Sequence, residues 1–410
     1  EIYTLSLHDA LPISSLIIGS KQKMANLELR SKKDYSPVTT AGIEITRDIS
    51  EWYELADRYK VQPEEIGLID LNRSGIHLPD GEIPENFRAR FIGTVNYGND
   101  LSWFALPVRR REDTMFQARE GAIYFNDKQI GFIDGSIELD TCDTSYQRGP
   151  HLLNLNSRSR SNCAGCRACV HNDKTLYDKR VIKDRHELTT YEDLEKFFDT
   201  KSAEGLEIDK LKQIAVVTGL FGGEANVVNH MRQIHKIIEP RGFRGELMYF
   251  GCEVNSDEAL RELSNLGNTS LVYAVDNFTN RAKFLAPFKA GISLDDAHST
   301  MARARALGIE TSFAYIAGVD NIESMHAGMK LFKDVSSRFP IINVFHVQTR
   351  VQGKVMNEEA KHLEYYLKAR ALVEDVFQDT SLRPRRWENY RPLWYKTFGN
   401  ELLNASPFGE

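Results

Sequence analysis

The second half of the chain alternates between short apolar runs and longer helical patterns, and this alternation limits the possible folds more than any other feature. The apolar runs predict strands at His151–Asn156, Ile214–Thr218, Glu246–Phe250, Ser270–Val275, Thr311–Ile316 and Ile341–Val347. The helical patterns cover Val227–Ile238, Asp257–Leu266, Asn280–Phe288, Leu294–Leu307 and Ile322–Arg338. Strands that alternate with helices of this length form a parallel sheet with right-handed crossovers. Six such strands predict an α/β fold, a partial (β/α)6 barrel of the TIM type, over residues 151–350.

The residues before the predicted barrel have a different character. Over 24–150 we expect a small β-rich or α+β accessory domain, with one helix followed by short strands. These elements are predicted at Ile49–Tyr59, Arg88–Val95, Ser102–Val108, Ala122–Phe125 and Gln129–Ile133. Asn126 and Asp127 between the last two strands predict a hairpin turn, because both residue types tolerate tight-turn backbone angles.

The two ends of the chain lie outside the predicted domains. Residues 1–23 contain no Met, and His8, Asp9 and Pro12 interrupt their apolar residues, so we interpret them as a non-native leader rather than a signal peptide. Residues 351–410 are expected to form a C-terminal extension that is helical through Val376.

Composition excludes several classes of protein. The 410 residues carry a net charge of −6, which does not favour a nucleic-acid binder. No run approaches the roughly 18–20 apolar residues that span a bilayer, which argues against a membrane protein. Five cysteines are too few for a disulfide scaffold. We therefore expect a cytoplasmic protein with no membrane partner.

Three of the five cysteines fall within seven residues. Cys163, Cys166 and Cys169 have the spacing C-x2-C-x2-C on a loop after the first predicted barrel strand. Zinc sites normally use two separated pairs of ligands, and a bacterial ferredoxin motif continues to a fourth Cys followed by Pro. Three thiolates favour a [4Fe–4S] cluster with one iron left open for another ligand. Zinc, or three unrelated cysteines, remain the alternatives.

A glycine-rich turn follows the next predicted strand. Gly222, Gly223 and Glu224 stand where the chain passes from a strand to a helix. Glycines there allow a ligand to approach the backbone closely, and a carboxylate can hold an ammonium group. The turn lies one strand–helix unit after the cysteine loop, which makes a common site possible.

With both motifs, residues 150–350 resemble the radical S-adenosylmethionine (radical SAM) enzymes, within them the biotin-synthase-like branch with a partial barrel. The cysteine spacing is one residue shorter than the C-x3-C-x2-C common in that family. The resemblance implies that the cysteines hold a [4Fe–4S] cluster and that Gly222, Gly223 and Glu224 bind the amino group of S-adenosylmethionine. It also implies further cofactor-binding residues after the fourth and fifth strands: Asp276, Asn277, Arg281 and Gly318.

The resemblance implies an activity but no substrate. The enzyme would cleave S-adenosylmethionine reductively, with flavodoxin or ferredoxin as electron donor, and a 5′-deoxyadenosyl radical would act on an unidentified small molecule or peptide. Cys252 ends the third predicted strand, where it could act catalytically on the substrate or serve as a small core residue. Two other classes remain open: an iron–sulfur hydro-lyase with an open iron site, and a non-catalytic zinc or iron–sulfur protein.

Overall fold

The computed structural model describes most of the chain after residue 41. The described residues are 42–77, 87–91, 104–106, 111, 113–136, 144–147, 151–158, 166–167, 187–217, 220–347, 350–385 and 392–403. The expected leader at 1–23 lies outside these ranges, as do Cys163 and Cys169. Among the described residues, every helix is too short or too polar to cross a membrane.

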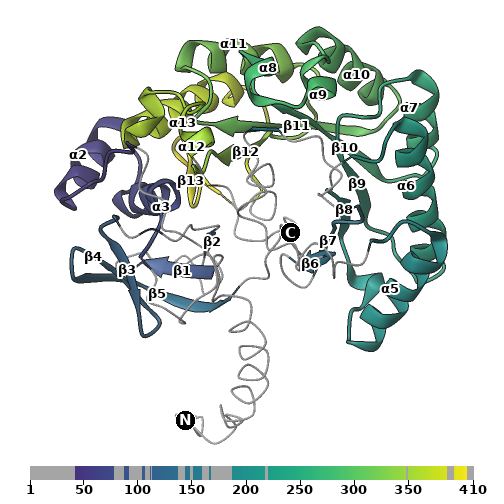
Figure 1. Ribbon diagram of the computed structural model, residues 1–410, viewed down its shortest axis with the longest axis horizontal. Coiled ribbons are helices and arrows are strands. Elements are labelled where there is room, and N and C mark those ends of the chain that lie inside the picture. Colours follow the sequence, from purple (N-terminus) through teal and green to yellow (C-terminus); the bar gives the residue numbers. More distant parts are fainter. Residues whose placement is uncertain are drawn as a thin grey trace, which may run out of the picture.

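A seven-stranded sheet dominates the described part of the chain, and its strand order is β12-β11-β10-β9-β8-β7-β6. Strands β7 to β12 pair in parallel with their neighbours, and β6 (Ser145–Gln147) pairs antiparallel with β7. The parallel strands are Leu152–Leu155, Gln213–Val216, Glu246–Gly251, Thr269–Asp276, Glu310–Ala317 and Ile341–Val344. Figure 1 shows them along an arc with the connecting helices outside it, so the prediction of a partial barrel is confirmed.

Except for the first, for which no bounds were predicted, the long crossover helices begin at or close to their predicted first residues. They are α5 (Tyr191–Ala203), α6 (Glu224–Ile238), α7 (Asp257–Ser264), α10 (Leu294–Ala306) and α11 (Ile322–Lys333), with a 3-10 turn η3 at Ile208–Lys210. The helix expected over Asn280–Phe288 is wrong as a single element. It is two short helices, α8 (Arg281–Phe284) and α9 (Pro287–Ala290). Pro287 disfavours helical geometry at the residue before it, so the chain is extended at Ala286.

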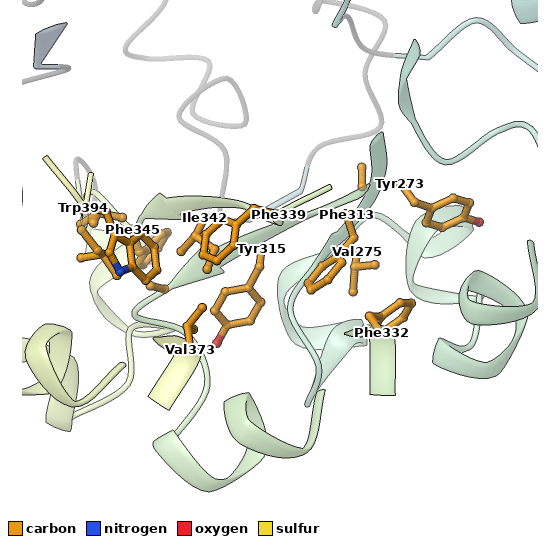
Figure 2. Packing of buried hydrophobic residues seen from close by; sticks show 14 of the residues in the cluster. Tyr273, Val275, Phe313, Tyr315, Phe332, Phe339, Ile342, Phe345, Val373 and Trp394 are labelled. Atoms are coloured by element: carbon orange, nitrogen blue, oxygen red, sulfur yellow. The ribbon is translucent and has the colours of Figure 1, made fainter. Parts of the chain in front are cut away.

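The two faces of the sheet carry different side chains. Ala215, Met248, Val272, Ala314 and Ile341 form a small separate cluster, one residue from each of five neighbouring strands. The alternate positions, among them Tyr273 and Phe313, belong to the larger cluster that packs against the helices. Figure 2 shows the ring of Phe313 near that of Phe332, which belongs to α11, and the ring of Tyr315 beside Val373. Burial on both faces explains why the strands read as continuous apolar runs.

A buried ion pair links the α11–β12 connection to the amino ends of neighbouring sheet strands. Arg338, in the α11–β12 connection, pairs with Glu246 at the start of β9. Glu246 also accepts hydrogen bonds from Gln213 Nε2 at 2.8 Å and Ser270 Oγ at 2.7 Å. The sequence predicts a helix through Arg338, but α11 ends at Lys333 and frees this arginine to reach the sheet.

Over its described residues, the N-terminal part contains two helices and a second sheet. Helices α2 (Ser50–Tyr59) and α3 (Pro63–Ser74) precede a five-stranded antiparallel sheet of order β2-β1-β5-β4-β3. Its strands are Phe87–Phe91, Phe104–Leu106, Phe116–Arg119, Ala122–Phe125 and Lys128–Ser136. Asn126 and Asp127 both have positive φ, at 47° and 61°, as the predicted hairpin turn requires. Helix α3 and strand β3 were not predicted.

The C-terminal extension is helical at first and ends in a hairpin. It contains α12 (Arg350–Gly353), a 3-10 turn η4 (Glu359–Lys361), α13 (Leu363–Phe377), β13 (Thr397–Phe398) and β14 (Glu401–Leu402). The hairpin follows the part that was predicted to be helical, through Val376, and was not itself predicted.

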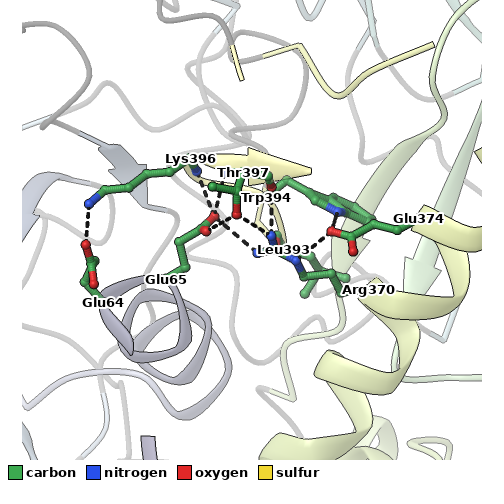
Figure 3. Close-up of polar contacts among 8 residues, drawn as sticks. All are labelled: Glu64, Glu65, Arg370, Glu374, Leu393, Trp394, Lys396 and Thr397. Carbon is green, nitrogen blue, oxygen red and sulfur yellow. Dashed lines mark hydrogen bonds and ion pairs between the residues drawn. The ribbon is translucent and has the colours of Figure 1, made fainter. Parts of the chain in front are cut away.

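Buried charges join this extension to α3. Arg370 of α13 donates to Glu65 Oε1 at 3.2 Å, and the same oxygen accepts the backbone N–H of Lys396 at 2.8 Å (Figure 3). Burial raises the pKa of Glu65, but Arg370 and the hydrogen bonds to Thr397 and Lys396 outweigh it, and the net pKa is lowered. The N-terminal helices are therefore fixed to the barrel by a paired carboxylate, not by apolar packing alone.

Candidate functional site

The residues singled out in the sequence follow the carboxyl ends of neighbouring parallel strands. The Gly-Gly-Glu turn follows β8, Cys252 follows β9, Asp276 ends β10 and Gly318 follows β11. In a parallel sheet these ends share one edge, where loops of barrels carry the active site. Parallel pairing of these strands therefore brings the candidate residues to a single rim.

Cys166 contacts the connection that follows β10. Its Sγ accepts the backbone N–H of Ala286 at 3.3 Å, and the N–H of the next residue, Arg167, donates to the carbonyl of Phe284 at 2.7 Å. The Cys166 side chain is half-buried and packs against the main core. Its neighbours Cys163 and Cys169 lie outside the described residues, so the structure locates the motif through Cys166.

A charged pair lies in the β10 connection that Cys166 contacts. Lys289 of α9 forms an ion pair with Asp276, and their side chains are 13% and 16% exposed. Burial lowers the pKa of Lys289, but Asp276, Cys252 and Cys166 raise it more, so the amine is firmly protonated. Burial, with Asp276 nearby, raises the pKa of the Cys252 thiol to about 11 despite Lys289. Cys252 is thus a neutral thiol near neutral pH.

The glycines of the Gly-Gly-Glu turn bind a carboxylate of the chain itself. Glu253 accepts the backbone N–H groups of Phe221, Gly222 and Gly223 at 2.8, 2.9 and 2.8 Å. Both glycines have positive φ, 82° and 129°, which lets consecutive amides point at one anion. The turn immediately precedes the N-terminus of α6, whose dipole also favours negative charge. Glu253 therefore fixes the shape of the exposed turn.

Glu224 also contacts the connection after β9. Its Oε2 accepts the backbone N–H groups of Asn255 and Ser256 at 3.1 and 2.9 Å. Burial raises the pKa of Glu224, but these amide hydrogen bonds outweigh it, and the net pKa is lowered. The half-buried side chain is a carboxylate at neutral pH. Glu224, after β8, thus accepts hydrogen bonds from the β9 connection, while Glu253, after β9, accepts them from the β8 connection.

Asn277 and Arg281 hold the connection after β10 in shape. Arg281 donates to the carbonyls of Val275 and Asn277 at 2.6 and 2.7 Å, and to that of Lys289 at 3.1 Å. Asn277 is 1% exposed and its Nδ2 donates to the Thr279 carbonyl. Both residues thus have structural contacts in this loop, and the cofactor-binding role that the resemblance implies for them stays a prediction.

Gly318 lies at a crowded turn after β11. It has φ of 115°, and a Cβ there would approach Phe345 Cβ at 3.0 Å and Tyr366 Oη at 3.2 Å. Asp320, two residues on, accepts the N–H groups of Phe278 and Thr279 at 2.8 and 3.0 Å. The β11 connection is therefore joined to the β10 connection, continuing the set of contacts around the rim.

Three of the residues that build this rim were not predicted from the sequence. Glu253, Lys289 and Asp320 were not singled out, although each stands in a connection that follows the carboxyl end of a predicted strand. A search for charged residues in those connections would have found them. The contact between Cys166 and Ala286 joins residues 120 positions apart, and no local pattern indicates it.

Comparisons with known proteins give a limited set of matches. No protein-family model matches the chain, and no curated protein does. Among solved structures, the radical S-adenosylmethionine methyltransferase TsrM from Kitasatospora setae, with cobalamin and a [4Fe–4S] cluster bound, is 14% identical with a TM-score of 0.33. The match covers 46% of this chain and 37% of that one.

A second match is the FeFe-hydrogenase maturase HydG from Carboxydothermus hydrogenoformans. It is 14% identical with a TM-score of 0.40, and the match covers 62% of each chain. The matched part spans less than two thirds of either protein, and the function proposed below is argued from the residues of this chain.

Proposed function

We propose that the chain is a radical SAM enzyme whose cysteine motif holds a [4Fe–4S] cluster at the carboxyl rim of a partial barrel. The observation that carries the proposal is the position of Cys166. The structure binds the middle cysteine of C-x2-C-x2-C to the β10 connection, at the rim that the Gly-Gly-Glu turn also reaches. The position of Cys166 at this rim supports a common site for the cysteine motif and the Gly-Gly-Glu turn.

The surroundings of Cys166 fit a thiolate ligand of a cluster. A backbone N–H points at its sulfur, and a protonated lysine in an ion pair lies nearby. Hydrogen-bond donors and positive charge stabilise thiolates, which are the form that binds metal. In this proposal Cys163 and Cys169 complete the ligand set.

The Gly-Gly-Glu turn fits the methionine end of S-adenosylmethionine. An ammonium group donates hydrogen bonds, so its partners would be backbone carbonyls of the turn and the carboxylate of Glu224, which is ionised at neutral pH. The amides of Gly222 and Gly223 serve Glu253 instead, and their part is to hold the turn in shape. Asp276 and Gly318 are proposed at the neighbouring positions of the same cofactor.

Bound together, the cluster and S-adenosylmethionine supply a 5′-deoxyadenosyl radical, with flavodoxin or ferredoxin as the proposed electron donor. The chain's own contribution is binding and orientation, since the β8 connection is bound to the β9 connection and the β10 connection to the β11 connection. Cys252, which keeps its hydrogen at neutral pH, is a candidate to contact the substrate. The substrate is proposed only as a small molecule or peptide.

Electron paramagnetic resonance on anaerobically reconstituted protein tests the proposal. We expect a [4Fe–4S]⁺ signal after reduction with dithionite, and a changed signal when S-adenosylmethionine is added. An iron–sulfur hydro-lyase would give the first signal without the change. One zinc per chain with negligible iron and sulfide would identify a metal-binding protein and contradict the proposal. The protein with Cys166→Ala serves as the control.

A further inference from the structure

We infer that the segment Phe284–Lys289, between α8 and α9, sets the reduction potential of the iron–sulfur cluster held through Cys166, by one amide hydrogen bond and one buried positive charge. The inference rests on the proposed function and adds positioning residues, Ala286 and Lys289, that act through a cluster ligand rather than on a substrate.

The amide is aimed at the sulfur by the local backbone. Leu285 and Ala286 are both extended, with ψ of 157° and 149°, because Pro287 ends the helical geometry before it. The N–H of Ala286 consequently leaves the α8 hydrogen-bond pattern and donates to Cys166 Sγ at 3.3 Å. The N–H of Arg167 donates a hydrogen bond to the carbonyl of Phe284 at 2.7 Å, and this second bond holds the cysteine loop against the segment.

The positive charge is held in place by the same segment. Lys289 is paired with Asp276, and its backbone carbonyl accepts a hydrogen bond from Arg281 at 3.1 Å. With only 13% of its side chain exposed, the ammonium group is weakly screened by solvent. Lys289 stands three residues after Ala286, whose N–H contacts Cys166 Sγ, so the same short segment carries both the hydrogen bond and the positive charge to the sulfur's side of the connection.

The amide hydrogen bond and the positive charge both raise the reduction potential of a cluster. Adding an electron makes the cluster more negative, and a hydrogen bond to a ligand sulfur or a nearby cation favours that state. The segment therefore raises the reduction potential above the value that the same three thiolates would give without it. This matters for an enzyme that must accept an electron from a soluble donor.

Ala286→Pro removes the amide hydrogen and places the ring Cδ where that hydrogen points toward Cys166 Sγ, so the iron content is measured to show that Cys166 still binds the cluster. Ala286 has φ of −60°, which proline adopts, and Leu285 has the extended geometry that the residue before proline requires. The Ala286 carbonyl, which accepts from Ala290 N–H at 2.8 Å, is kept. The expected result is a cluster of unchanged iron content whose midpoint potential is lower than in the wild type.

Lys289→Met removes the charge and keeps most of the side chain's length. A redox titration at about pH 8 keeps the remaining Asp276 carboxylate ionised, so the potential is again expected to fall. Lys283→Met is the matched control, because Lys283 stands one residue before this segment, in α8, and its side chain is exposed. The control should leave the potential at the wild-type value.

The experiment is a redox titration of reconstituted, full-length protein followed by electron paramagnetic resonance, without S-adenosylmethionine. A fall in potential for Ala286→Pro and Lys289→Met, with none for Lys283→Met, supports the inference. Equal potentials in all four proteins overturn it while leaving the proposed function intact. If circular dichroism shows that Ala286→Pro does not fold, Lys289→Met decides alone. A wild-type protein that assembles no cluster overturns the proposed function instead.

Discussion

Glu253 Oε1 accepts the backbone N–H of Gly223 at 2.8 Å, so a carboxylate at the end of β9 holds the turn that opens α6. The turn belongs to the motif proposed to bind S-adenosylmethionine, and Glu253 itself is not part of that motif. The shape of the ligand-binding turn therefore depends on the next strand connection, not only on its own two glycines.

Glu253→Gln should loosen this turn. The neutral amide cannot replace a carboxylate that accepts three N–H groups. The free energy of one charge-assisted hydrogen bond corresponds to a change of roughly tenfold in a dissociation constant. We expect S-adenosylmethionine to bind about tenfold more weakly, and hydrogen exchange at the amides of Phe221, Gly222 and Gly223 to accelerate. Glu258→Gln, in the exposed first turn of α7, is the control. Equal exchange rates in both variants would show that Glu253 does not shape the turn.

Glu224→Gln should act on the ligand directly. Glutamine keeps an oxygen that can accept the N–H groups of Asn255 and Ser256, so the connection after β9 should stay folded. The charge that pairs with an ammonium group is lost, which corresponds to roughly ten- to a hundredfold in affinity. Isothermal calorimetry on reconstituted protein measures this. Unchanged affinity together with an intact cluster would remove Glu224 from the proposed binding site.

His230 should make the stability of the chain depend on pH. Burial, and then the charge of Arg158, lower the pKa of His230 to about 4, while Nε2 lies 2.8 Å from Ser157 Oγ. Between pH 6.5 and 4 the unfolded chain binds a proton that the folded chain does not. The free energy of unfolding should therefore fall by about 3 kcal/mol as pH drops through this window, and this effect should level off below it.

Urea denaturation at several pH values, with wild type and His230→Gln compared, isolates this contribution. The difference between the two proteins should change steadily from pH 6.5 to 4. A difference that is constant over that range would mean that His230 is protonated in the folded protein, contrary to the lowered pKa.

The sequence predicted the barrel because its strands are buried on both faces. Runs such as Ser270–Val275 have apolar character without alternation, and helices of regular length separate them. Helix α3 was missed because its charged residues, Glu65, Asp70 and Arg73, are buried in ion pairs and read as a polar segment.

From the sequence, the candidate site could be predicted only as separate motifs, without the contacts between them. The order of strands places Glu224, Cys252 and Asp276 at one edge, because parallel strands share their carboxyl ends. Sequence spacing says nothing about the long-range contacts between connections, such as Ala286 with Cys166 or Asp320 with Phe278. These contacts depend on how loops pack across the rim, which tertiary structure alone determines.

Product analysis of the reduced protein tests the proposed function most directly. Reconstituted protein, reduced with dithionite and given S-adenosylmethionine without any substrate, should slowly release 5′-deoxyadenosine and methionine, and chromatography should detect both above the level of the Cys166→Ala protein. Release of 5′-methylthioadenosine instead would mean that a different carbon–sulfur bond breaks. No product from a reduced cluster that binds S-adenosylmethionine would contradict the assignment as a radical SAM enzyme.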